Sequence, residues 1–134
     1  MEKVTVNVSY EGGGYGASID ILPGCIAVAD SFKKLRTLLE EGMAMHLQSM
    51  REDGDPIPGA FNGEYRLIYK LDAQALLATY DGIFTKAALS RMSGVNEKQL
   101  WHYALGVRKP RPAQREKITH ALHGLGNELI GVEL

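Results

Sequence analysis

The sequence contains one cysteine and no long hydrophobic run, and both features limit what the protein can be. With Cys25 alone, no disulfide can form within the chain, which fits a reducing compartment. A membrane-spanning helix needs about 20 consecutive apolar residues, and no run approaches that length. The start, MEKVTVNVSY, alternates between apolar and polar residues instead of forming the apolar centre of a signal peptide. We therefore expect a cytoplasmic globular protein.

The net charge of −1 is small because oppositely charged segments offset each other. Residues 1–84 contain seven Lys or Arg and twelve Asp or Glu, a charge of −5. Residues 85–123 contain eight and two, a charge of +6, and residues 124–134 add −2. A chain of 134 residues can bury two small cores. The asymmetry predicts two modules with different partners, of which the basic one binds a polyanion.

The first 70 residues have the pattern of a small sheet. KVTVNVSY alternates strictly, which is typical of a half-buried strand, and the glycines of EGGGYG then turn the chain. YGASIDI and CIAVAD continue as the second and third strands of a meander, and EYRLIYKL is a fourth strand. We predict an α+β fold whose N-terminal domain, residues 1–70, contains a small antiparallel sheet with one helix.

That helix lies between the third and fourth strands, with Asp30 or Ser31 as its N-cap. Apolar residues recur at steps of three and four along it and form one stripe, which contains Phe32, Leu35, Leu39, Met43, His46 and Met50. Residues 51–64, REDGDPIPGAFNGE, follow the helix. Their prolines and glycines predict a loop or linker, because such a stretch cannot continue a helix.

The sequence shows no pattern of catalytic residues. EGGGYG precedes a strand, whereas a phosphate-binding loop precedes a helix. Asp20 is the only acid in the interior of a predicted strand, and Cys25 is expected to fill the core. His120 and His123 lack a third metal ligand. We expect no enzymatic activity, no cofactor and no metal. A metal-dependent nuclease that uses Asp20 is an alternative hypothesis.

Residues 71–134 predict an all-helical domain. Thr85 caps a helix in TKAALSRMSG, and Gly94 ends it with the left-handed conformation that a tight exit requires. Asn96 caps the next helix, with Gln99 three residues later to complete a capping box. A further helix begins at Pro112. Two helices joined by so short a turn predict a helix-turn-helix, whose second helix enters the DNA major groove.

The second of these helices has one apolar and one polar side. At 100° per residue, Leu100 and Tyr103 share one side, so burying them turns Lys98, Trp101 and His102 outward. Lys98 is a residue type that contacts base edges, and Trp101 can pack against a thymine methyl group or a sugar. The alternative for Trp101 is packing against the helix that begins at Pro112.

VRKPRP follows this helix directly, and its prolines hold the backbone extended. Its cations suit DNA phosphates, which fix register without specifying sequence, although a solvated linker is the alternative. Thr85 and Lys86, at the start of the preceding helix, are also included among the predicted contacts. The complete predicted DNA-binding set is Thr85, Lys86, Lys98, Gln99, Trp101, His102, Arg108, Lys109 and Arg111.

The order of motifs resembles the HicB family of antitoxins along nearly the whole chain. YGASIDILPGCIAVADSFKKLRTLLEEGMAMHL is similar to the N-terminal signature of the family, and DGDPIPG resembles the polar stretch after its helix. TKAALSRMSGVNEKQLWHYALGVRKPRP is similar to the phage-repressor-like (XRE-type) helix-turn-helix at the C-terminus of one HicB branch. Other branches carry a ribbon-helix-helix, but residues 71–125 predict too many helices for that fold.

This resemblance implies a bacterial antitoxin. Its N-terminal domain would have a partial ribonuclease-H-like fold without ribonuclease activity and would mask a HicA-type mRNA-cleaving toxin. Its C-terminal domain would bind operator DNA and repress the toxin–antitoxin operon as a homodimer or larger homo-oligomer. The sequence assigns no toxin-contacting residues. The alternative is a stand-alone transcriptional regulator whose N-terminal domain dimerises or senses a ligand.

Overall fold

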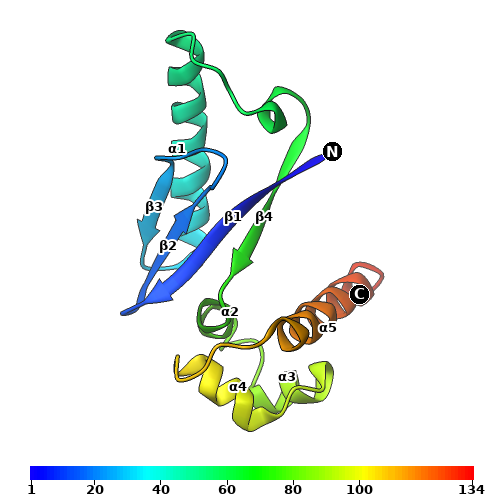
Figure 1. Ribbon diagram of the computed structural model, residues 1–134. Helices are drawn as coiled ribbons and strands as arrows, with labels where there is room; N and C mark the ends of the chain where they lie inside the picture. The colour runs from blue at the N-terminus through cyan, green and yellow to red at the C-terminus, as the bar shows by residue number, and fades with distance from the viewer. The chain divides into compact units, whose positions relative to one another are not determined.

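Four strands and one long helix form the first of two units in the computed structural model, which describes residues 1–134 (Figure 1). This unit comprises Met1–Ala75, and the second comprises Leu76–Leu134. The fold is α+β, with one four-stranded sheet and five α-helices. The strands are β1 (Glu2–Glu11), β2 (Gly14–Ser18), β3 (Ile26–Ala29) and β4 (Tyr65–Leu71).

The sheet is mixed, with the strand order β3-β2-β1-β4. β1 pairs antiparallel with β2, and β2 pairs antiparallel with β3, as a meander requires. β4 pairs parallel with β1, for example Val4 with Leu67. The predicted antiparallel sheet is therefore wrong for its fourth strand. The reason is the helix α1 (Phe32–Glu52), which separates β3 from β4 and returns the chain to the start of the sheet, so that β4 runs in the direction of β1.

α1 begins after Ser31, whose Oγ accepts a hydrogen bond of 3.2 Å from the Lys34 backbone N–H. Asp30, the other predicted cap, instead pairs with the Lys34 ammonium at 3.1 Å. The buried face of α1 consists of Leu35, Leu39, Met43 and Leu47. Three of these belong to the predicted stripe, but Leu47 replaces His46, which is half-buried. The core also contains the alternate residues of β1, Val4, Val6 and Val8, as the strand pattern predicted.

Residues 51–64, for which the sequence predicts a loop, contain regular structure at two places. α1 continues to Glu52, and a 3-10 turn, η1 (Gly59–Asn62), follows. η1 places Phe61 in the core at 4% exposure, with its ring 5.0 Å from that of Tyr65. Asp20, predicted within a strand, lies exposed in the turn after β2.

Cys25 is buried at 4% exposure, just before β3. Burial raises the pKa of its thiol, which lowers the fraction of reactive thiolate at a given pH.

Because Cys25 is buried, we expect iodoacetamide at about pH 8 to alkylate the native protein at least about tenfold more slowly than the protein unfolded in urea. Mass spectrometry of timed samples measures both rates. Equal rates would show that Cys25 is not buried in the core of the first unit.

The second unit is helical. Its buried residues are Leu77, Leu89, Val95, Leu100, Tyr103 and Ile118. Asp72 caps α2 by accepting a 2.7 Å hydrogen bond from the Ala75 N–H, and the boundary between the units falls within this helix. None of the helices combines the length and the apolar character needed to cross a bilayer. The helices are α2 (Ala73–Thr79), α3 (Lys86–Ser93), α4 (Glu97–Ala104) and α5 (Pro112–Ile130).

Candidate nucleic-acid interface

The position of α4 is set by caps and one glycine. Thr85 Oγ1 accepts a hydrogen bond of 2.9 Å from the Ala88 N–H and starts α3. Gly94 ends α3 with φ of 77°, a conformation that glycine adopts without steric cost. Asn96 Oδ1 accepts a hydrogen bond of 2.8 Å from the Lys98 N–H and starts α4. Thr85, Gly94 and Asn96 are confirmed as caps. The predicted capping box differs, because Asn96 bonds to the N–H of Lys98 and not to that of Gln99. Only residues 94–96 separate the two helices.

The two sides of α4 differ in burial. Leu100 is 0% exposed and Tyr103 is 4% exposed, so the predicted apolar side does face the core of the second unit. Lys98 and Trp101 are exposed, as predicted, and Gln99 is half-buried. The surface of α4 therefore presents a cation and an indole to solvent.

His102 lies between the two sides instead of fully outward. It is half-buried, and its Nδ1 is buried without a hydrogen-bond partner. A neighbouring residue is only 100° away around a helix, so the burial of Tyr103 pulls the edge of the His102 ring inward. Its backbone carbonyl accepts a hydrogen bond of 3.0 Å from the Val107 N–H and so tightens the exit from α4.

Lys86, a predicted DNA contact, is engaged within the unit. Its ammonium lies 2.9 Å from Asp81 Oδ1 and 4.7 Å from the centroid of the Trp101 ring. Its side chain is only 10% exposed, whereas Asp81 is 70% exposed. The sequence pattern did not indicate Asp81. An acid in a loop five residues before a lysine gives no sign that the two side chains pair, or that the lysine lies over an aromatic ring of the next helix. Lys86 thus links the start of α3 to the exposed face of α4.

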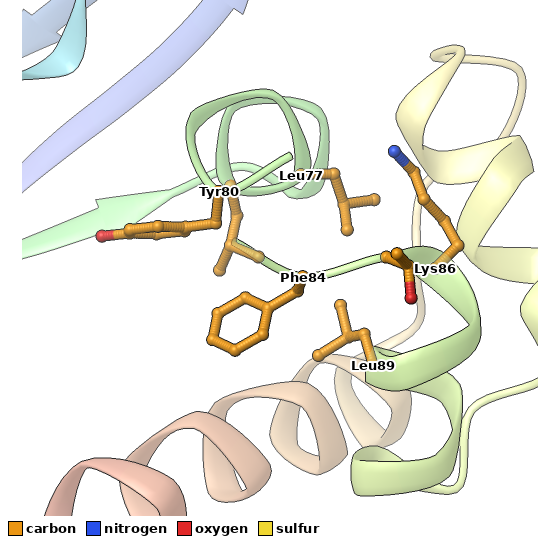
Figure 2. A pocket seen from close by; sticks show the side chains of 7 residues that line it. Leu77, Tyr80, Phe84, Lys86 and Leu89 are labelled. Atoms are coloured by element: carbon orange, nitrogen blue, oxygen red, sulfur yellow. The ribbon is translucent and has the colours of Figure 1, made fainter. Parts of the chain in front are cut away.

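The side chain of Lys86 also borders the pocket of the second unit that Figure 2 shows. The remaining lining is mostly apolar and comes from Leu76, Leu77, Tyr80, Phe84, Thr85 and Leu89. Its free volume of about 10 Å³ is on the order of one water molecule, so it is not a small-molecule site. The pocket instead marks where the start of α3 packs against the preceding residues.

A cationic segment follows α4. Gly106 turns the chain with φ of 75°, and Val107 is 67% exposed. Arg108, Lys109 and Arg111 are all exposed, and neither of the ion pairs in the protein involves them. Arg111 has extended backbone angles, φ −70° and ψ 158°, and precedes Pro112 at the first turn of α5, as predicted.

The acids, the histidines and the cysteine form no metal-ligating cluster. No group of three or more His, Cys, Asp or Glu side chains is arranged to hold a metal ion. His120 and His123 are both exposed on α5. The candidate site is therefore the surface of α4 and residues 105–111, which presents exposed cations and an exposed indole.

Comparison with known proteins finds no protein-family model that matches the chain and no matching curated protein.

Proposed function

We propose that the protein is a DNA-binding repressor in which α3 and α4 form a helix-turn-helix and α4 lies in the major groove. One observation carries the proposal: a three-residue turn orients α4 so that its buried side is Leu100 and Tyr103 and its free side holds Lys98 and Trp101. A short, capped helix with one face free is what insertion into the groove requires.

Charge supports the same proposal. The second unit contains eight Lys or Arg and five Asp or Glu, a charge of +3. Residues 98–115 contain five cations and no acid. Lys98, Arg108, Lys109 and Arg111 form no ion pair, so their charge is available to a polyanion. Phosphate contacts by such residues supply most of the affinity for DNA, whatever its sequence.

Different residues take different roles in this proposal. Lys98 and Gln99, in the first turn of α4, contact base edges, whereas Arg108, Lys109 and Arg111 contact phosphates. The Thr85 hydroxyl accepts the capping bond and can still donate its proton to a phosphate at the start of α3. Lys86 is a positioning residue, because its ammonium is held between Asp81 and Trp101.

The resemblance to HicB antitoxins adds a protein partner. In this part of the proposal the first unit masks a HicA-type toxin. It contains seven Lys or Arg and eleven Asp or Glu, and its charge of −4 is complementary to a basic RNA-cleaving protein.

Purification of the tagged chain from its native host tests this partner. Recovery of a small basic protein whose RNA cleavage the chain inhibits is the expected result. If the chain is recovered alone and still binds DNA, it is a stand-alone regulator whose first unit dimerises or senses a ligand.

Lys98→Ala and His102→Ala test the assignment of α4. We expect Lys98→Ala to weaken binding to the operator, selected from random DNA, by about 1–3 kcal/mol and to leave non-specific binding nearly unchanged. His102→Ala should act in the same direction. Lys117→Ala, an exposed lysine on α5, is the matched control. Gel shifts on operator and scrambled duplexes measure the effect, and toxin inhibition should survive every variant. Unchanged operator binding by a folded Lys98→Ala protein would contradict the assignment.

A further inference from the structure

Trp101 is exposed, yet a cation lies over its indole ring. The residue is 49% exposed, and the Lys86 ammonium lies 4.7 Å from the centroid of its ring. The same ammonium is fixed by Asp81 at 2.9 Å, and only 10% of the Lys86 side chain is exposed. A cation held over an aromatic face away from water interacts strongly with it. Asp81 and Lys86 therefore limit the motion of Trp101 before any ligand binds.

Leu105 extends this apolar surface. It lies four residues after Trp101, at the C-cap of α4, and is 67% exposed. Residues four apart lie on the same side of a helix, so the side chains of Trp101 and Leu105 are neighbours on the free face. Lys98 and Gln99 occupy the first turn. The free face thus has a polar N-terminal half and an apolar C-terminal half.

Each half matches a different feature of the major groove. The groove presents hydrogen-bonding groups from every base pair, but only one apolar group, the C5 methyl of thymine. Neighbouring exposed apolar side chains, unlike isolated ones, mark a contact surface. A leucine and an indole cannot distinguish bases by hydrogen bonds to carbonyl or amino groups, except through the single indole N–H.

We propose that Trp101 and Leu105 recognise thymine methyl groups, and that Asp81 and Lys86 are positioning residues for this recognition. The proposal rests on the proposed DNA-binding function and adds the base specificity of the α4 surface. Lys98 and Gln99 set the specificity of the adjoining base pairs. Because Trp101 and Leu105 contact thymine methyl groups, we expect each operator half-site to contain at least one thymine opposite the second half of α4.

The experiment replaces each thymine of the selected operator, one at a time, with deoxyuridine. This change removes only the methyl group and leaves every hydrogen-bonding group in place. We expect wild-type protein to bind about fourfold more weakly for each contacted methyl group that is lost. Trp101→Ala and Leu105→Ala should bind the thymine operator more weakly and should lose the thymine-to-deoxyuridine ratio at their own positions. Both residues are exposed, so both variants should fold.

Asp81→Asn tests the positioning role. We expect it to reduce the thymine-to-deoxyuridine ratio while the salt dependence of binding stays unchanged, because no phosphate contact is removed. Lys98→Ala is the matched control, since it should lower affinity and keep the ratio. If Asp81→Asn keeps the thymine-to-deoxyuridine ratio of the wild-type protein, the positioning role of Asp81 and Lys86 is wrong. Equal binding of the two operators by wild-type protein would overturn methyl recognition but not DNA binding, whereas absence of any sequence-specific binding would overturn the proposed function itself.

Discussion

Leu100→Ala is expected to destabilise the second unit by about 2–5 kcal/mol and to abolish specific DNA binding. Leu100 is 0% exposed and, with Tyr103, anchors α4 to the core of the second unit. Removing its side chain leaves a cavity that so small a unit cannot fill. A unit of 59 residues, Leu76–Leu134, has a total stability on the order of 3–9 kcal/mol, so the loss is a large share of it.

Urea unfolding followed by circular dichroism measures the change, and the alkylation rate of Cys25 reports separately on the first unit. The core around Cys25 is built only from residues between Val4 and Ala75, so its protection should persist in Leu100→Ala. Leu105→Ala is the matched control, because the same side chain at 67% exposure should change stability by less than about 0.5 kcal/mol. Wild-type stability of Leu100→Ala would refute the placement of α4.

The double variant Arg108→Ala/Lys109→Ala is expected to weaken binding to every DNA sequence by a similar factor. Both side chains are exposed and unpaired, so their loss removes phosphate contacts without disturbing the core. Each phosphate contact contributes about 0.9 to the slope of log K against log salt concentration, so the slope should fall by about 1.8. Affinity at low salt should fall, and the ratio of specific to non-specific affinity should stay near the wild-type value.

Fluorescence anisotropy on operator and scrambled duplexes, from about 50 to about 200 mM salt, measures both quantities. Arg66→Ala/Lys70→Ala is the control, because it removes the same charge from exposed positions of β4 in the first unit. If that control lowers the slope equally, the effect comes from net charge. If Arg108→Ala/Lys109→Ala leaves the slope unchanged, residues 108–111 are a solvated linker.

Features that depend on neighbours in sequence could be predicted. Thr85 and Asn96 bond to backbone groups two or three residues away, so a short window contains the whole interaction. The same is true of Gly94, whose backbone angles suit glycine whatever surrounds it. The burial of Leu100 and Tyr103 follows from helical periodicity once α4 is assigned. The exposure of Lys98 and Trp101 on the candidate surface was therefore predictable, whereas the half-burial of His102 was not.

Features that depend on residues far away in the sequence could not be predicted. The direction of β4 relative to β1 is decided by the path of α1, which no alternation within YRLIYKL encodes. Phe61 enters the core because η1 folds back between α1 and β4, although its local composition is that of a loop. His102 is half-buried because a neighbouring helix position is fixed in the core.

The amino-acid order alone determined the strands, the helix caps, the turn between α3 and α4 and the charge contrast between the two halves, since hydrogen bonds and periodicity within a few residues specify them. Tertiary structure decided which cations remain free. Lys86 and Lys98 are both helix-start lysines in the sequence, but packing of α3 beside α4 places Lys86 between Asp81 and Trp101 and leaves Lys98 in solvent. A side chain's availability depends on what the fold brings within a few ångströms of it, and those neighbours lie outside any local pattern.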